Sequence, residues 1–142
     1  MKVRIRLMKK TIWLLSSIML IVSISLGVFY LRSDKLNVDF VKKAEVCFQY
    51  GNTNAINQLS DKEVESVKLL FNEKKLYKDN LSCGFSEAVS IIFDDEQTFC
   101  IARDTCPIVY WKEKDRYIRL TEDEKIWLYN LLEPYGFIFP CV

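Results

Sequence analysis

Hydrophobic residues near the start of the chain form one uninterrupted segment. The 21 residues from Thr11 to Leu31 carry no charge. A helix rises about 1.5 Å per residue, so this segment reaches roughly 30 Å, the thickness of a membrane's hydrocarbon core. A cleaved signal peptide would have a shorter apolar region, roughly 7–15 residues, and a clear small-residue cleavage site. The best candidate site, at residues 25–27, is weak, so the pattern predicts a retained transmembrane helix over residues 11–31.

The remainder of the chain alternates between apolar and polar positions in short runs. This alternation is typical of strands with one buried face. The runs lie at residues 45–50, 88–93, 98–102, 107–112 and 117–120. Short polar segments separate most of them, and such lengths favour antiparallel hairpins. The sequence therefore predicts an antiparallel sheet of about four or five strands.

Two segments show the start signal of a helix followed by apolar residues at helical spacing. In Ser60-Asp61-Lys62-Glu63 and again in residues 121–124, a hydroxyl residue precedes a glutamate by three positions, which is a capping box. The helices predicted behind these boxes place their apolar stripes at residues Val64, Val67, Leu70 and Phe71, and at Trp127, Leu128, Leu131 and Leu132. Pro134 predicts the end of the second helix.

Together these elements predict an α+β domain behind a single N-terminal transmembrane helix. The expected organisation is a basic segment at residues 1–10, the helix at 11–31, a polar stalk at 32–44 and the domain at 45–142. One or both helices should lie on one face of the sheet. The apolar tail, YGFIFPCV, is expected to pack on the sheet, with a disulfide as one possible tie.

Charge is distributed unevenly along the chain. Five Lys and Arg and no acid precede the apolar segment, which predicts a cytoplasmic N-terminus and an extracytoplasmic domain. From Ser33 onward, 14 Lys and Arg stand against 19 Asp and Glu, a net charge of −5. An acidic domain of this kind argues against binding to nucleic acid, whose phosphates require a basic surface.

All five cysteines lie after the apolar segment, on its predicted outer side. In an oxidising compartment this arrangement predicts two disulfides and one free thiol, with fifteen possible connectivities. Four cysteines fall in the C-terminal half and are the disulfide candidates: Cys83, Cys100, Cys106 and Cys141. Cys47 is then the unpaired thiol. A single reactive thiol at Cys106 is the competing interpretation, which requires a neighbour that lowers its pKa.

Groups that carry catalysis are scarce in this sequence. The chain has no histidine, which excludes Ser-His-Asp and Cys-His catalysis in their usual form. Without histidine or a Cys-x-x-Cys pair no metal site is predicted, and the lack of a glycine-rich loop predicts no nucleotide cofactor. Aromatic residues crowd the last third of the chain. They are expected to fill the core, with those of the tail as the main candidates for an exposed interaction surface.

Three short segments resemble a group of small, uncharacterised proteins of Gram-positive bacteria. They are CGFS at residues 83–86, IARDTCP at 101–107 and YGFIFPC at 135–141. The resemblance implies an anchored or secreted protein and carries no activity. The leading functional hypothesis is a non-enzymatic domain that binds a protein partner at the outer membrane face. The alternatives are a thiol-dependent redox protein and a small structural subunit of a membrane assembly.

Overall fold

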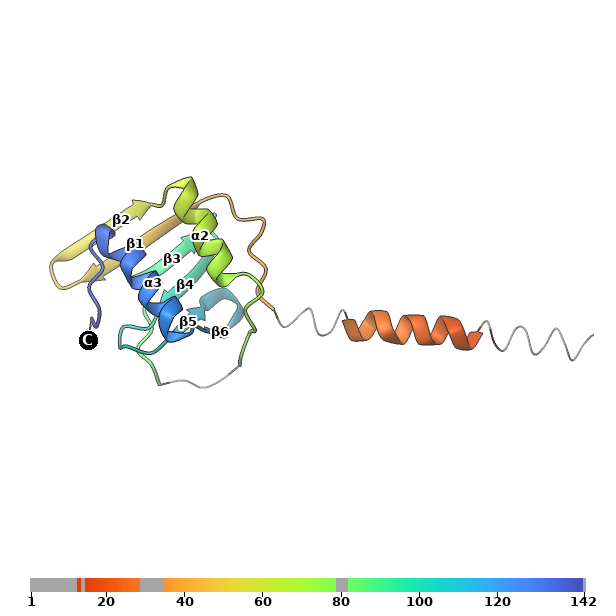
Figure 1. Cartoon of the computed structure of the whole chain (residues 1–142). Coiled ribbons are helices and arrows are strands. Elements are labelled where there is room, and N and C mark those ends of the chain that lie inside the picture. The colour runs from red at the N-terminus through yellow and green to blue at the C-terminus, as the bar shows by residue number, and fades with distance from the viewer. Residues whose placement is uncertain (1–12, 14, 29–34, 79–81, 142) are drawn as a thin grey trace, which may run out of the picture. The chain divides into compact units, whose positions relative to one another are not determined.

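The computed structural model describes residues 13, 15–28, 35–78 and 82–141. Contacts divide the chain into two units, Met1–Asp34 and Lys35–Val142. The predicted basic segment at residues 1–10 lies outside the described residues. The second unit carries the sheet and two helices (Figure 1).

The helix of the first unit covers residues 15–28. Its hydroxyl groups bond within the helix, since Ser17 and Ser23 donate to backbone carbonyls four residues earlier. Among the described residues no helix is long and apolar enough to cross a membrane. This finding contradicts the predicted transmembrane helix at residues 11–31, of which residues 11, 12, 14 and 29–31 lie outside the described part. The extracytoplasmic location stays a prediction.

The second unit is built on one antiparallel sheet of six strands in the order β2-β1-β3-β4-β5-β6. The strands are β1 Ala44–Tyr50, β2 Thr53–Gln58, β3 Val89–Phe93, β4 Gln97–Ile101, β5 Ile108–Trp111 and β6 Arg116–Arg119. The sequence predicted about four or five strands, which was wrong because β2 was missed. That strand forms a hairpin with β1 through Gly51-Asn52, and Gly51 adopts a positive φ of 59° in the turn.

Two helices cover one face of the sheet (Figure 1). Helix α2 spans Asp61–Phe71 and α3 spans Glu122–Leu132, and both predicted capping boxes are present at their starts. Helix α2 buries Val64, Val67 and Phe71, whereas α3 buries Leu128 and Leu132. The helices therefore pack the predicted stripes against the sheet, except that Trp127 of the second stripe is 38% exposed.

The hydrophobic core lies between these helices and one face of the sheet. Alternate strand residues supply the sheet's contribution, among them Phe48, Ile91, Phe99, Val109 and Ile118. The segment before β1 also enters the core, because Leu36, Val38 and Val41 are buried there. Its backbone is fixed by bonds in both directions between Leu36 and residues 73–74. The packed domain thus begins before β1.

Glu63 joins the start of α2 to the segment that follows α3. Its carboxylate accepts hydrogen bonds from the Ser60 backbone N–H (2.9 Å) and the Tyr135 hydroxyl (2.7 Å). The hydrogen bond from the Ser60 side chain, followed in size by that from Tyr135, stabilises the charged carboxylate and so lowers the pKa of Glu63. Because the pKa of Glu63 is lower in the folded protein than in the unfolded chain, its ionised carboxylate stabilises the fold at pH values above the unfolded-state pKa. This stabilisation is lost as the pH falls through the folded-state pKa.

Replacing Glu63 by glutamine is expected to lower the free energy of unfolding at neutral pH by about 1 kcal/mol. The difference from the wild type should shrink in the acid range, where the wild-type carboxylate is protonated. Urea unfolding at neutral and acid pH measures both values. Glu65→Gln on the same helix is the control, because its exposed carboxylate pairs with Lys68 and should contribute less than about 0.5 kcal/mol. A Glu63→Gln difference that does not change with pH would contradict the assignment.

Candidate functional site

The five cysteines of the domain are all free thiols. The two closest sulfurs, those of Cys83 and Cys106, share a hydrogen bond at 2.7 Å. A disulfide needs a separation of about 2.05 Å, so this pair is not bonded. The prediction of two disulfides is therefore contradicted for Cys83, Cys100, Cys106 and Cys141 alike.

Strand register separates two further cysteines. Cys47 on β1 pairs with Ser90 on β3, and Ser90 pairs with Cys100 on β4, so the thiol residues occupy strands on either side of Ser90. Two strand spacings amount to roughly 10 Å, beyond the limit of about 7 Å between the Cα atoms of a disulfide. Burial and the charge of Glu45 raise the pKa of Cys47, and burial is the main cause that raises the pKa of Cys100 to about 11. Both thiols are consequently protonated at neutral pH.

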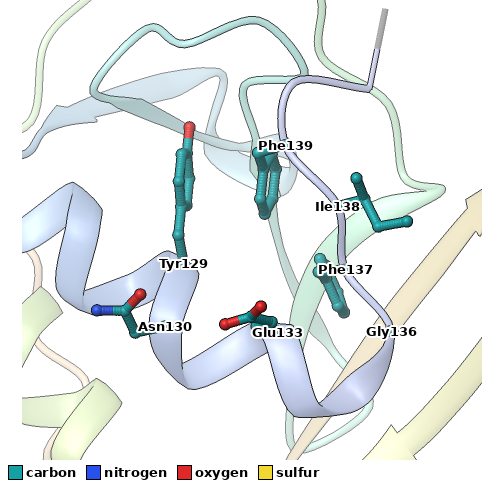
Figure 2. Close-up of a pocket in the computed structure, with 7 residues that line it drawn as sticks. All are labelled: Tyr129, Asn130, Glu133, Gly136, Phe137, Ile138 and Phe139. Carbon is teal, nitrogen blue, oxygen red and sulfur yellow. The ribbon is translucent and has the colours of Figure 1, made fainter.

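The C-terminal tail forms a pocket with α3. A short 3-10 helix, Glu133–Tyr135, follows α3 directly, and Gly136 then adopts a positive φ of 89°. This conformation suits glycine and turns the chain so that the tail runs back beside α3 (Figure 2). The resulting cavity measures about 360 Å³. It is lined by Tyr129, Asn130, Glu133, Gly136, Phe137, Ile138 and Phe139.

Aromatic rings give the pocket a firm apolar wall. The rings of Tyr129 and Phe139 stack almost parallel, with centroids 4.0 Å apart, as Figure 2 shows. Phe137 is only 3% exposed and packs against Phe48 on the sheet, with centroids 4.8 Å apart. Ile138, between the two phenylalanines in sequence, is 65% exposed. The tail is therefore anchored by its phenylalanines and presents an aliphatic side chain at the surface.

Two hydrogen bonds with Arg103, one of backbone and one of side chain, fix the end of this tail. The Cys141 N–H donates to the Arg103 carbonyl at 2.9 Å, and Arg103 Nε donates to the Cys141 carbonyl at 3.1 Å. Burial raises the pKa of Cys141 even though the Arg103 charge opposes this effect. Hydrogen bonds and aromatic packing thus hold the tail in place, in the role that the sequence analysis considered for a disulfide.

The pocket lining carries a single charged group, the carboxylate of Glu133. The side-chain amide of Asn130 lies one turn earlier on α3 and belongs to the same lining. The Tyr129 hydroxyl is buried without a hydrogen-bond partner among the described residues. Burial, followed by the charges of Asp104, Cys141 and Cys106, raises the pKa of Tyr129 to about 12. Tyr129 is therefore neutral, and Glu133 sets the charge of the pocket.

A second group of side chains brings together two of the predicted cysteines. Ligand atoms of Cys83, Asp104 and Cys106 lie within 4.8 Å of one another, and all three residues are half-buried. No such group was expected from the sequence, because Cys83 and Cys106 lie on separate segments rather than in a Cys-x-x-Cys pair. These residues are the ones that could hold a metal ion among those that the structure describes.

The pocket itself was only partly anticipated. The tail aromatics were expected to be the exposed ones, but Phe137 is buried, and the strongly exposed apolar side chain is Ile138. The sequence signal for the pocket is the Pro134-Tyr135-Gly136 segment, which ends the helix and reverses the chain. In comparisons with known proteins, no family model, curated protein or solved structure matches this chain.

Proposed function

We propose that the domain is a non-enzymatic binding module whose pocket between α3 and the tail takes an organic cation with an apolar body. The ligand class is an aryl- or alkylammonium group, either free or as part of a larger partner. The observation that carries this proposal is a wall of aromatic rings beside Glu133, the one charged residue of the pocket lining. This function keeps the binding hypothesis and gives it a location and a chemistry.

The apolar part of the proposed ligand follows from the shape and lining of the pocket. Small-molecule sites are concave, mostly apolar and about 300–1,000 Å³ in volume, with a few polar groups that fix orientation. The pocket is at the lower end of this range and therefore suits a small group such as a phenyl ring or a short alkyl chain. Ile138 and the stacked rings of Tyr129 and Phe139 supply its apolar contacts.

The positive charge of the proposed ligand follows from Glu133 and the aromatic faces. A carboxylate attracts an ammonium group, and the face of an aromatic ring attracts it as well. No lysine or arginine lines the pocket, so an anionic ligand would find no counter-charge there. A second cavity of about 380 Å³, lined by Ser66, Leu69, Leu70 and Trp127, lacks any charged group. The charge of Glu133 therefore distinguishes the two depressions.

The thiol-dependent redox hypothesis stays a prediction and receives no support from the electrostatics. It requires Cys106 as a thiolate at neutral pH. The hydrogen bond with Cys83 is the largest influence on Cys106, and with burial and Asp104 it raises the pKa of this thiol to about 12. Cys106 is then protonated and a weak nucleophile.

Binding of phenethylammonium, measured by calorimetry against two matched probes, tests the proposed function. The probes are 2-phenylethanol, which is neutral, and 3-phenylpropionate, which is anionic. We expect the cation to bind the full-length protein about 5- to 30-fold more tightly than the alcohol, because an exposed ion pair and a cation–π contact together contribute about 1–2 kcal/mol. The anion should bind most weakly.

The variant Glu133→Gln should reduce binding of the cation about two- to fivefold and leave binding of the alcohol unchanged. Asp123→Asn, at the opposite end of α3, is the matched control and should bind all three probes as the wild type does. Equal affinity of the wild type for the three probes would refute the proposal. So would a cation preference that is as large in Glu133→Gln as in the wild type.

A further inference from the structure

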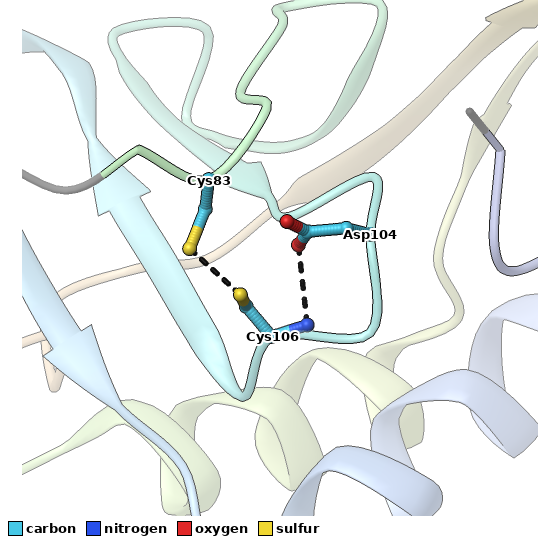
Figure 3. Close-up of side chains that lie close together, drawn as sticks. All are labelled: Cys83, Asp104 and Cys106. Atoms are coloured by element: carbon cyan, nitrogen blue, oxygen red, sulfur yellow. Dashed lines mark hydrogen bonds between the residues drawn. The ribbon is translucent and has the colours of Figure 1, made fainter.

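The turn between β4 and β5 is a meeting point of four segments of the chain. It carries Asp104 and Cys106, and the segment before β3 brings Cys83 beside them (Figure 3). Cys83 and Cys106 are separated by 22 intervening residues, which include the strands β3 and β4. Their proximity is therefore a product of the fold, and short-range sequence patterns do not reveal it.

Hydrogen bonds to each neighbouring segment hold this turn in place. The Arg103 N–H donates to the Gly84 carbonyl at 2.9 Å, which fixes the loop of Cys83 against the turn. The Arg103 carbonyl accepts from Cys141 of the tail, and the Thr105 carbonyl accepts from Lys125 Nζ on α3 at 3.1 Å. A site supported in this way by the surrounding structure is preorganised.

Two thiols and one carboxylate converge inside this framework. The sulfurs of Cys83 and Cys106 are 2.7 Å apart, and one oxygen of Asp104 accepts a hydrogen bond from the Cys106 backbone N–H at 3.2 Å (Figure 3). That bond orients the Asp104 carboxylate across the turn. All three ligand atoms lie within 4.8 Å of one another. This spacing is short enough for one ion to reach each of them.

The geometry points to a binding site for a thiophilic divalent cation, of which Zn²⁺ is the representative, with Cys83, Asp104 and Cys106 as ligands. Thiolates and carboxylates are zinc ligands, at about 2.3 Å and 2.0–2.2 Å respectively. Cations that prefer only oxygen ligands, such as Mg²⁺ and Ca²⁺, are excluded by the two sulfurs.

The fit requires one small adjustment. A tetrahedral ion about 2.3 Å from each thiolate holds the two sulfurs roughly 3.8 Å apart, so they must separate by about 1 Å from their present distance. A change in the Cys83 side-chain torsion supplies this movement. Three protein ligands leave one coordination position open, as in zinc sites that exchange a water molecule or another ligand. The bound ion would therefore keep one position for an exchangeable ligand such as water.

Titration of the reduced full-length protein with Co²⁺, followed by Zn²⁺, tests the site directly. The reductant should be a phosphine, so that no added thiol competes for the metal. We expect one Co²⁺ per chain with a thiolate-to-cobalt charge-transfer band, and loss of this band when Zn²⁺ displaces Co²⁺. Absence of a charge-transfer band in the wild type would overturn the inference.

Variants identify the ligands. Cys83→Ser and Cys106→Ser should each weaken Co²⁺ binding at least about tenfold and reduce the charge-transfer intensity, whereas Asp104→Asn should weaken binding and keep the band. Cys47→Ser is the matched control because it removes a thiol from the sheet and should bind as the wild type does. Circular dichroism confirms that each variant is folded. Full Co²⁺ binding by both Cys83→Ser and Cys106→Ser would overturn the inference, as would equal weakening by Cys47→Ser.

This site shares no residue with the lining of the proposed ammonium pocket. Glu133→Gln should therefore bind Co²⁺ with the wild-type affinity and spectrum, and the two proposals can fail separately.

Discussion

Replacing Phe71 by alanine is expected to lower the free energy of unfolding by about 3–5 kcal/mol, the cost of emptying a buried phenylalanine site. Phe71 at the end of α2 is fully buried, and its ring contacts those of Phe93 and Phe99, with centroids 5.9 Å and 5.3 Å away. The substitution leaves a cavity at the junction of helix and sheet. Because domains are stable by only about 5–15 kcal/mol, this loss is a large share of the total.

Urea unfolding monitored by tryptophan fluorescence measures this loss. Leu69→Ala on the same helix is the matched control, since Leu69 is 81% exposed and its truncation should change stability by no more than about 0.5 kcal/mol. Similar effects of the two substitutions would show that α2 does not pack on the sheet through Phe71.

The second large effect is expected at the tail. Phe137→Ala should lower the free energy of unfolding by about 3–5 kcal/mol, because Phe137 is buried against Phe48. Its neighbour Ile138 is exposed, so Ile138→Ala should leave stability within about 0.5 kcal/mol of the wild type while it weakens binding of phenethylammonium. Thermal unfolding and calorimetry of both variants separate these roles. A neutral Phe137→Ala would contradict the docking of the tail.

The helices and most strands could be predicted because their signals are local. Ser60 with Glu63 and Thr121 with Glu124 form capping boxes in the sequence and in the structure. The strands β3 to β6 show alternation that places Ile91 and Phe99 on the core face. In each case a periodic pattern and a start or stop signal agree, which is the situation in which sequence specifies structure most clearly.

Strand β2 was missed because its stability comes from its neighbour. Its residues, TNAINQ, are mostly polar and include asparagine, which is depleted in strands. Six backbone pairs with β1 hold it at the edge of the sheet. The contribution of Leu36, Val38 and Val41 to the core was missed because the short segment that carries them was assigned to a polar stalk.

The membrane and disulfide predictions failed because each rested on composition. The apolar segment at residues 11–31 has sufficient length in sequence, but among the described residues no helix is long and apolar enough to cross a membrane. The five cysteines suggested bridges by their number, whereas register keeps Cys47 and Cys100 on strands that flank β3. The proximity of Cys83 to Cys106 depends on how a loop docks on the β4–β5 turn. Three-dimensional contacts of this kind leave no local sequence signal.

Binding of an ammonium group beside Glu133, in the pocket between α3 and the tail, can be followed by NMR titration of the full-length protein with phenethylammonium. Such binding should give saturable shifts of the Ile138 methyl resonances and of the Tyr129 and Phe139 ring resonances, with no change at Leu69 and Trp127 in the uncharged cavity. Shifts confined to Leu69 and Trp127, or no saturable shifts at all, would contradict it.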